Sequence, residues 1–237
     1  MDKLLAKGKD LISFEDDNGW RWYGTSETPY LYPSITTILK ETVHQPGLIN
    51  WFKYSNARDI DKKLAETGRI GTELHELFDS ILKGNRAMLK REYQPHAAAF
   101  SKWVNDVQAE PYLTEFTVFS DRYGFAGKID FYGRVNGRNT VVDWKTGTNF
   151  GDTWGDQVAA YQLAVCEMAD LPSDDVDFMI LQINRESAEL KSFKYVHKDW
   201  MQNSFLLALE RFKRVPRFTK LQKLKWPYLM KKGMVRA

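Results

Sequence analysis

Two hydrophobic periods alternate along this chain, and together they predict an α/β protein. Spacings of three and four residues predict a long helix over about 59–82, because residues at those intervals share one face of a helix; the positions are Leu64, Gly68, Gly71, His75, Phe78 and Leu82. Further helices are expected over 96–107, 153–168 and 199–212. β-Branched and aromatic runs predict strands over 114–119, 125–135, 140–145, 176–183 and 190–195. This order indicates an α/β core preceded by a helical elaboration.

The first part of the chain predicts smaller elements. The sequence FEDDNGW indicates a hairpin around Asn18-Gly19. Ser34 is a suitable N-cap for a short helix ending near Leu39. We therefore expect an N-terminal hairpin and helical elaboration over 1–58, a core over 59–213 and a basic C-terminal segment over 214–237.

Composition favours a folded, soluble protein. Hydrophobic residues make up 43% of the 237 positions and aromatic residues 14%, which is enough for a substantial core. The N-terminus lacks the apolar stretch of a signal peptide, and no segment reaches the roughly 20 apolar residues of a membrane span. We expect a soluble intracellular protein without a membrane partner. Cys166 is the only cysteine, so we expect no disulfide, no thiolate zinc site and no iron–sulfur cluster.

Charged residues are distributed unevenly along the chain. Residues 211–237 hold ten of the 34 Lys and Arg residues and none of the 31 Asp and Glu residues. Residues 1–210 therefore have 24 basic and 31 acidic side chains, a net charge of −7. This split suits an acidic metal site in the body and a polyanion bound elsewhere. Phe212, Phe218, Trp226 and Tyr228 interleave with the basic residues, so the segment suits base stacking and phosphate contact, docking on the body, or binding a protein partner.

The stretch GFAGKIDFYGRVNGRNTVVDWKTG contains the most specific prediction. Asn136-Gly137 between two β-rich runs indicates a two-residue hairpin turn. With that turn Val135 pairs with Arg138, and counting back along both strands places Asp130 opposite Asp143. Directly opposed residues lie about 4.5–5.5 Å apart at Cβ. Two carboxylates so close repel each other unless a cation or a shared proton lies between them.

Strand alternation adds a cation to this face of the hairpin. Lys145 points to the same side as Asp143, and Lys128 lies opposite Lys145 in the inferred register. Paired carboxylates are the hard oxygen ligands that Mg²⁺ prefers, and an adjacent ammonium can orient water or offset transition-state charge. The alternative is an exposed hairpin carrying ordinary surface charges, and a β-bulge would shift the register.

These residues resemble the PD-(D/E)xK nuclease superfamily. Asp130 followed by Asp143-Trp144-Lys145 matches its signature, and further motifs resemble the RecB-type exonuclease branch: GTELH at 71–75, DWKTG at 143–147 and Gln157-x-x-x-Tyr161. The opening YPSITTILKET resembles mitochondrial genome maintenance exonucleases and their phage relatives. The resemblance implies a restriction-endonuclease-like core, a mixed sheet flanked by helices, and a phage-encoded origin with action in the host cytoplasm is compatible with it.

The resemblance also implies roles for individual residues. His75, Asp130, Asp143 and the Trp144 backbone carbonyl become ligands of Mg²⁺ or Mn²⁺, and Lys145 becomes catalytic. Gln157 and Tyr161 would support the site or touch DNA, although Tyr161 also fits a packing role. Lesser candidates come from the residues themselves: Gly71 as a point of close approach, Glu115 as an outer acid, and Lys128 and Arg69 as phosphate contacts. The alternatives are helix packing for Gly71 and an ordinary solvent-facing position for the three charged residues.

Three functions are compatible with this interpretation. The favoured one is a metal-dependent DNA exonuclease acting on single strands or free ends, with the N-terminal helices arching over the site. A structure-specific endonuclease or nickase on the same core is the second. The third is a non-catalytic DNA-binding recombination accessory protein, which the intact set of His75, Asp130, Asp143 and Lys145 disfavours.

Overall fold

A five-stranded mixed sheet forms the centre of the computed structural model, which describes residues 11–25, 28, 30–44, 57–85, 90–195 and 197–218. The strand order follows the sequence, β4-β5-β6-β7-β8. The strands are β4 (Glu110–Ser120), β5 (Phe125–Val135), β6 (Arg138–Lys145), β7 (Asp177–Ile183) and β8 (Leu190–Lys194). All neighbouring pairs are antiparallel except β6 and β7, which run parallel. The crossover that a parallel pair requires contains a helix, α6 (Trp154–Ala169).

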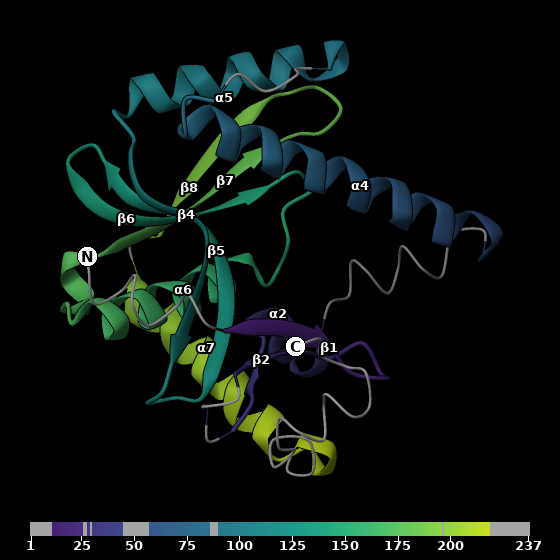
Figure 1. Cartoon of the computed structure of the whole chain (residues 1–237), viewed down its shortest axis with the longest axis vertical. Coiled ribbons are helices and arrows are strands. Elements are labelled where there is room, and N and C mark those ends of the chain that lie inside the picture. The colour runs from purple at the N-terminus through teal and green to yellow at the C-terminus, as the bar shows by residue number, and fades with distance from the viewer. Residues whose placement is uncertain are drawn as a thin grey trace.

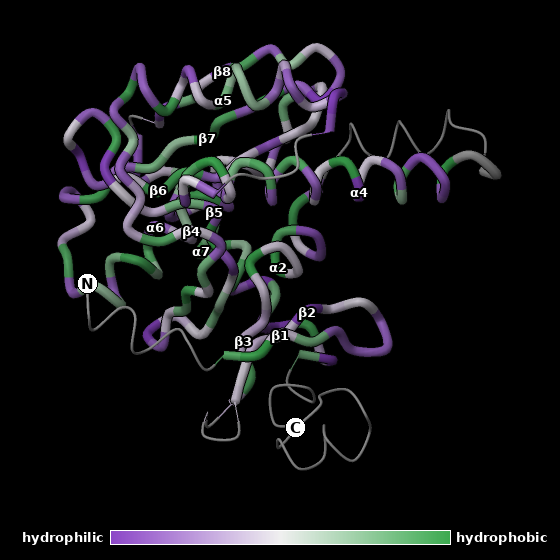
Figure 2. Tube along the Cα trace, turned by 45° about the horizontal axis from the view of Figure 1, so that its top comes forward, coloured by the Kyte–Doolittle hydropathy of each residue, from purple (hydrophilic) through white to green (hydrophobic). Residues whose placement is uncertain are grey.

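Helices cover both faces of this sheet (Figure 1). On one face lie α4 (Ala57–Leu82) and α5 (Gln94–Asp106), and on the other lie α6 and α7 (Lys198–Lys213). Each face has its own buried cluster, with Phe78, Phe100 and Trp144 on the α4–α5 side and Val158, Phe178 and Phe205 on the α6–α7 side. The strands at the centre carry the hydrophobic colour in Figure 2, as expected for a sheet buried on both faces. Two 3-10 turns, η1 (Arg91–Tyr93) and η2 (Ser173–Asp175), complete these elements.

The N-terminal elements form a small second sheet that joins the same core. Its strands, in antiparallel order, are β1 (Ile12–Glu15), β2 (Arg21–Gly24) and β3 (Tyr32–Pro33), followed by α2 (Ile35–Thr42). The β1–β2 hairpin encloses Asn18-Gly19, as predicted. Ser34 caps α2 by accepting a hydrogen bond from the backbone N–H of Thr37, and the helix continues to Thr42, beyond the predicted end at Leu39.

Two aromatic residues of the basic stretch 211–237 are core residues, in agreement with the docking alternative and not with base stacking. Phe212 is fully buried and Phe218 is 4% exposed. Their rings pack against each other and against Trp20 and Trp22 of the small sheet. They are therefore not available for base stacking, because the apolar rings gain more by closing the core at the end of α7. Trp226 and Tyr228 lie outside the described residues.

The predicted elements agree with the observed ones to within a few residues, with one larger difference. β4 begins at Glu110, four residues before the predicted start. A register shift between Pro111 and Leu113 lets the strand continue past an irregularity that interrupts its hydrophobic alternation. Asn136 and Gly137 both have positive φ, at 51° and 77°, as a type I′ hairpin turn requires.

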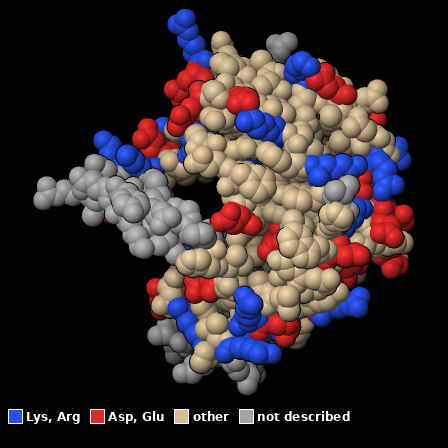
Figure 3. Space-filling model, turned by 180° about the vertical axis from the view of Figure 1, so that it is seen from behind, with Lys and Arg blue, Asp and Glu red and all other residues tan. Residues whose placement is uncertain are grey.

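The first half of α4 extends away from the body (Figure 1). Residues 61–69 are all exposed, whereas Leu74 and Phe78 farther along the helix are fully buried. Acidic and basic side chains are interspersed on the face drawn in Figure 3, without a continuous stripe of either sign. No helix in the described part of the chain is both long and apolar enough to span a bilayer.

Alanine substitutions at two glycines should change stability in opposite directions. A Cβ at Gly133 of β5 would lie 2.1 Å from the carbonyl oxygen of Glu110, a backbone atom that cannot move without disturbing β4. We expect Gly133→Ala to lower the free energy of unfolding by about 1–3 kcal/mol. Gly68 is helical, and nothing lies within 4 Å of the place that a Cβ would occupy. Gly68→Ala should therefore raise the free energy of unfolding by roughly 0.5–1 kcal/mol. Urea unfolding of both variants tests the packing, and equal midpoints would contradict it.

Candidate functional site: carboxylates at an opening in the sheet

The central sheet opens at Asp130. The β5–β6 ladder runs in the predicted register from Val135–Arg138 to Phe131–Val142 and ends there, one step before Asp130 and Asp143. From this point β5 continues beside β4, while β6 continues beside β7. The β4–β5 ladder is interrupted at the same level, because its pairs at 114–131 and 116–129 leave Glu115 and Asp130 unpaired. The opening therefore has carboxylates on three adjacent strands.

A side-chain hydrogen bond replaces the missing rung between β5 and β6. Asp130 Oδ2 accepts from the backbone N–H of Trp144 at 2.7 Å, and both groups are buried. The Trp144 indole points to the opposite side, where it packs against Phe100 and Trp103 of α5. Because one oxygen of Asp130 is used in this way, its other oxygen, Oδ1, is left to face His75.

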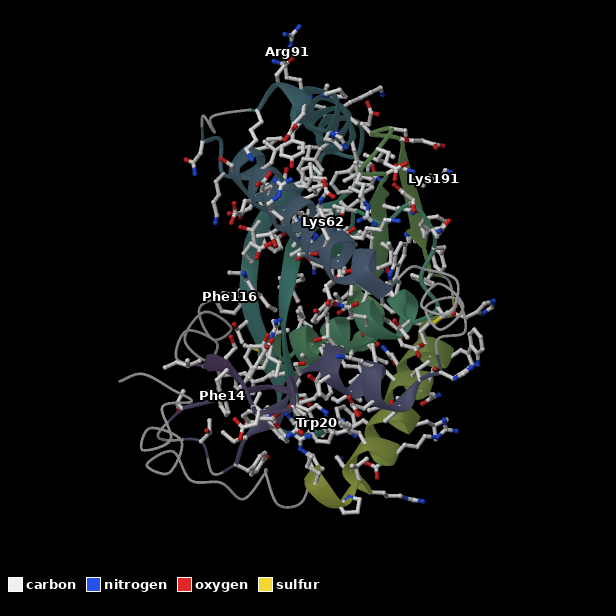
Figure 4. All side chains as sticks on the ribbon, turned by 90° about the vertical axis from the view of Figure 1, so that its right-hand side faces the viewer. Phe14, Trp20, Lys62, Arg91, Phe116 and Lys191 are labelled. Carbon is white, nitrogen blue, oxygen red and sulfur yellow. The ribbon has the colours of Figure 1, made fainter. Side chains whose placement is uncertain are left out.

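His75 reaches the opening from α4. Its Nδ1 lies 3.2 Å from Asp130 Oδ1 and 3.9 Å from Glu115 Oε1. Burial alone would lower the pKa of His75, but the negative charges of Asp130, Asp143 and Glu115 outweigh it and raise the pKa. In Figure 4, α4, which carries the labelled Lys62, crosses in front of the sheet whose edge strands carry Phe116 and Lys191.

Glu115 has a larger part in the cluster than the sequence indicated. Its φ of 50° lies in the left-handed region, which costs an ordinary residue about 1–3 kcal/mol. Ligand atoms of His75, Glu115 and Asp130 all lie within 4.8 Å of one another. Glu115 Oε2 forms an ion pair with Lys128, whereas its Oε1 is buried without a hydrogen-bond partner among the described residues.

Asp143 and Lys145 share one face of β6, as the alternation predicted. Lys145 Nζ lies 2.7 Å from Asp143 Oδ2, and that oxygen is buried without a hydrogen bond of normal geometry to any described residue. Burial raises the pKa of Asp143 to about 6, with Lys145 opposing the shift and Asp130 adding to it. Asp143 lies outside the compact group of three ligand atoms, because its carboxylate turns toward Lys145.

Two residues of α6 connect Lys145 to the core. Lys145 Nζ donates to Gln157 Oε1 at 2.8 Å, and Gln157 Nε2 donates to the Tyr161 hydroxyl at 3.0 Å. Tyr161 is 4% exposed, and burial raises its pKa well above the ordinary value, so it stays neutral. A Cβ at Gly127 of β5 would lie 2.6 Å from the Tyr161 ring, so glycine there lets the ring pack against the strand. Gln157 and Tyr161 lie one helical turn apart on α6. Tyr161 bonds Gln157, and Gln157 in turn fixes the position of the Lys145 ammonium.

A groove of about 730 Å³ leads along α4 to the cluster. His75, Glu115, Lys128, Gly71 and Thr146 contribute to its lining. A Cβ at Gly71 would lie 3.3 Å from Thr146 Oγ1, so glycine brings α4 close to the segment after β6, as the predicted close approach requires.

Two predicted phosphate contacts are placed differently from expectation. Lys128 does not face Lys145, because the β5–β6 ladder has already ended; it pairs with Thr117 on β4, and its ammonium contacts Glu115. Arg69 is not part of the groove lining, and its guanidinium donates to Glu73 at 2.9 Å.

The donor set fits a divalent cation. Three carboxylates and one imidazole meet two ammonium groups, which leaves an excess of negative charge in a largely buried space. Glu115 Oε1 and Asp143 Oδ2, which make no hydrogen bond of normal geometry to the described residues, are the kind of hard ligand that Mg²⁺ or Mn²⁺ accepts.

Sequence reasoning overlooked two aromatic residues beside this cluster. The Trp154 ring centre lies 5.9 Å from Lys145 Nζ, and Phe150 contacts Trp154 at a centroid distance of 4.9 Å. The glycine-rich run TGTNFGDTWG between the last site strand and the next helix was the available signal, since glycines permit close approach to a large ring.

Comparison with known proteins gives one family match. The family model described as PD-(D/E)XK nuclease superfamily matches residues 57–222. Proteins of curated function give no match. Among solved structures, the crystal structure of a "Putative exonuclease" from Eubacterium rectale has a TM-score of 0.44 and 14% sequence identity, covering 86% of this chain and 83% of that chain. A likeness at that level carries no argument about function.

Metal binding should depend on pH through Asp143. A cation needs the carboxylate ionised, so affinity should fall as pH decreases through about 6 and level off above it. We expect Mn²⁺ to bind about tenfold or more weakly at pH 5.0 than at pH 7.5, measured by isothermal titration calorimetry. The raised pKa of His75 also weakens metal binding as the pH falls, because only the neutral imidazole can be a ligand.

A matched variant distinguishes this site from general surface charge. Asp170 caps α6 with φ 57°, a conformation that Asn also tolerates, so Asp170→Asn should bind Mn²⁺ as the unaltered protein does. Asp143→Asn should lose most of the affinity. Wild-type affinity in Asp143→Asn, or equal affinity at the two pH values, would contradict the assignment.

Proposed function

Because the chain belongs to the PD-(D/E)XK nuclease superfamily, we propose that it is a metal-dependent DNA exonuclease acting on single strands or free ends. Its family makes it a nuclease that uses divalent metal ions and DNA as substrate. The observation that best supports a catalytic role is that the pairs His75–Asp130 and Asp143–Lys145 lie at one opening in the sheet. A non-catalytic protein would have little reason to retain buried, mutually repelling carboxylates.

In this proposal His75, Asp130, Asp143 and the Trp144 carbonyl hold Mg²⁺ or Mn²⁺, and Glu115 joins them. When bound there, a divalent cation would polarise the scissile phosphate and lower the pKa of a water molecule next to it. Asp130 is fixed by the Trp144 N–H at 2.7 Å, so its free oxygen keeps one direction. Glu115 contributes a third carboxylate, from β4, and its Oε1 has no hydrogen-bond partner among the described residues.

Lys145 is the proposed catalytic cation. Its ammonium is held between Asp143 at 2.7 Å and Gln157 at 2.8 Å, and its side chain is 17% exposed. At that position it can orient the attacking water and stabilise negative charge as it develops on the phosphate oxygens. Gln157 and Tyr161 act as positioning residues, because they contact Lys145 or each other and not the metal ligands.

The position of α4 supports the proposed preference for DNA ends. This helix supplies His75 from its second half, and its first half extends beyond the body beside the groove. A strand entering along the groove would pass under that helix before reaching the carboxylates. Entry of this kind favours a free end over a closed circle.

Substrate topology tests the proposal. End-labelled linear single-stranded DNA, linear duplex and circular single-stranded DNA are incubated with Mg²⁺, with Mn²⁺ and with EDTA. We expect metal-dependent degradation of the linear single strand, no degradation in EDTA and survival of the circle. Equal cleavage of the circle would replace the proposal with an endonuclease, and absence of cleavage with either metal would overturn it.

Lys145 should be required for the chemistry in that assay. We expect Lys145→Ala to lower kcat about 10²- to 10⁴-fold, because it removes the cation that acts on the reacting atoms. Lys102→Ala is the matched control, since Lys102 is 75% exposed and forms its ion pair with Asp106 on its own helix. Similar kcat values for Lys145→Ala and Lys102→Ala would contradict the role.

Gln157 should affect kcat more than binding. Gln157→Leu removes the acceptor at 2.8 Å from Lys145 while retaining side-chain volume, so we expect kcat to fall about 10- to 100-fold with little change in KM. Tyr161→Phe keeps the buried ring and removes only the hydroxyl that orients Gln157, so a smaller loss in the same direction is expected. Thermal unfolding of both variants separates positioning from lost stability, and an unchanged kcat in Gln157→Leu would exclude the positioning role.

A further inference from the structure

An aromatic shelf lies beside the site, formed by Phe150, Trp154 and Phe193. Phe150 belongs to the segment after β6, Trp154 begins α6, and Phe193 lies on the edge strand β8. The Phe150 ring contacts Trp154 at a centroid distance of 4.9 Å and Phe193 at 5.0 Å, with interplanar angles of 55° and 65°. Two separate elements therefore hold the ring of Phe150 from two sides.

Phe150 remains 49% exposed despite these contacts. An exposed aromatic ring held by two other rings loses little conformational freedom when a flat partner covers it. Its neighbours Trp154 and Phe193 are only partly buried and pack on the core at their inner edges. The shelf is therefore anchored on the core through Trp154 and Phe193, while about half of the Phe150 side chain stays accessible to a ligand.

The glycines of this segment fit around Trp154. A Cβ at Gly151 would lie 2.3 Å from the indole Nε1, and one at Gly147 would lie 3.5 Å from the far ring edge. The segment 146–153 therefore wraps the indole and presents Phe150 on its outer side. This arrangement positions the shelf through backbone that also borders the site, since Thr146 lines the groove.

The shelf is continuous with the proposed catalytic residues. Lys145 Nζ lies 5.9 Å from the Trp154 ring centre and 2.7 Å from Asp143 Oδ2. A phosphate positioned for Lys145 would therefore have its neighbouring nucleotide within reach of Phe150. Aromatic rings next to phosphate-binding cations are the usual means of holding unpaired bases, because every base has a π-face.

We infer that Phe150, supported by Trp154 and Phe193, stacks on an unpaired nucleobase next to the scissile phosphate and selects single-stranded DNA. This inference rests on the proposed function, since it assigns the shelf to the substrate of that same site. A base inside a duplex has both faces covered by its stacked neighbours and its edge bound to the other strand, so it cannot lie on the ring unless it is first unpaired. Selection then follows from stacking and does not require reading of the sequence.

Binding without cleavage tests the shelf. Fluorescence anisotropy in Ca²⁺ measures the Kd of a labelled single-stranded oligonucleotide, of the same oligonucleotide with one abasic position moved along it, and of a duplex. For the unaltered protein we expect one abasic position to weaken binding about tenfold. Phe150→Ala should weaken binding of the complete single strand to a similar extent, and the abasic position should add no further loss in this variant.

Two further variants separate stacking from surface hydrophobicity. Phe150→Leu keeps an apolar side chain without a ring and should resemble Phe150→Ala. Leu207→Ala removes another large exposed hydrophobe, 64% exposed on α7, and should bind as the unaltered protein does. Duplex affinity should be the same in all four proteins.

The outcomes are distinguishable from those of the nuclease assay. Undiminished single-strand affinity in Phe150→Ala, or a duplex loss as large as the single-strand loss, overturns the shelf even if the protein cleaves DNA. Conversely, a single-strand loss confined to the Phe150 variants supports the shelf whether or not cleavage is observed. Because Phe150 is half-exposed, its replacement should leave the thermal midpoint close to that of Leu207→Ala, which checks that the variant is folded.

Discussion

Where β5 and β6 part, the carboxylate of Asp130 accepts a hydrogen bond from the backbone N–H of Trp144 at 2.7 Å. A sheet that opens in its interior leaves buried backbone groups without partners, at a cost of about 1–3 kcal/mol for each. Asp130 supplies the missing acceptor and so allows β6 to leave β5 and run beside β7. The same carboxylate presents its second oxygen to His75. One side chain therefore stabilises the opening and forms part of the site within it.

The helices on both faces of the sheet contribute side chains to the opening, so the candidate site depends on how both layers pack on the strands. α4 contributes His75 from one face, and α6 contributes Gln157 from the other. Glycines bring these layers close: Gly71 lets α4 approach Thr146, and Gly127 lets Tyr161 pack on β5. A Cβ at Gly127 would overlap the Tyr161 ring, and a Cβ at Gly71 would crowd the Thr146 side chain.

Electrostatics explains why this arrangement suits a cation. Asp130, Asp143 and Glu115 converge where burial disfavours charge, and the raised pKa of Asp143 reflects that penalty. Lys145 and Lys128 offset part of the negative charge from opposite sides. A divalent metal ion of this nuclease family would neutralise the remaining negative charge. Two carboxylate oxygens that make no hydrogen bond of normal geometry to the described residues are available to it.

Local sequence determined most of the elements and the register of the key hairpin, because the Asn136-Gly137 turn and strand alternation are short-range effects. It thereby predicted that Asp143 and Lys145 share a face. It did not predict the end of the ladder before Asp130 or the displacement of Lys128 toward Glu115. It left open whether Phe212 and Phe218 would stack on bases or dock on the body, as they do against the small sheet. Those outcomes depend on contacts between residues far apart in the chain. Only the packed tertiary structure decides them, since a strand's periodicity specifies which way a side chain points but not which neighbour it meets.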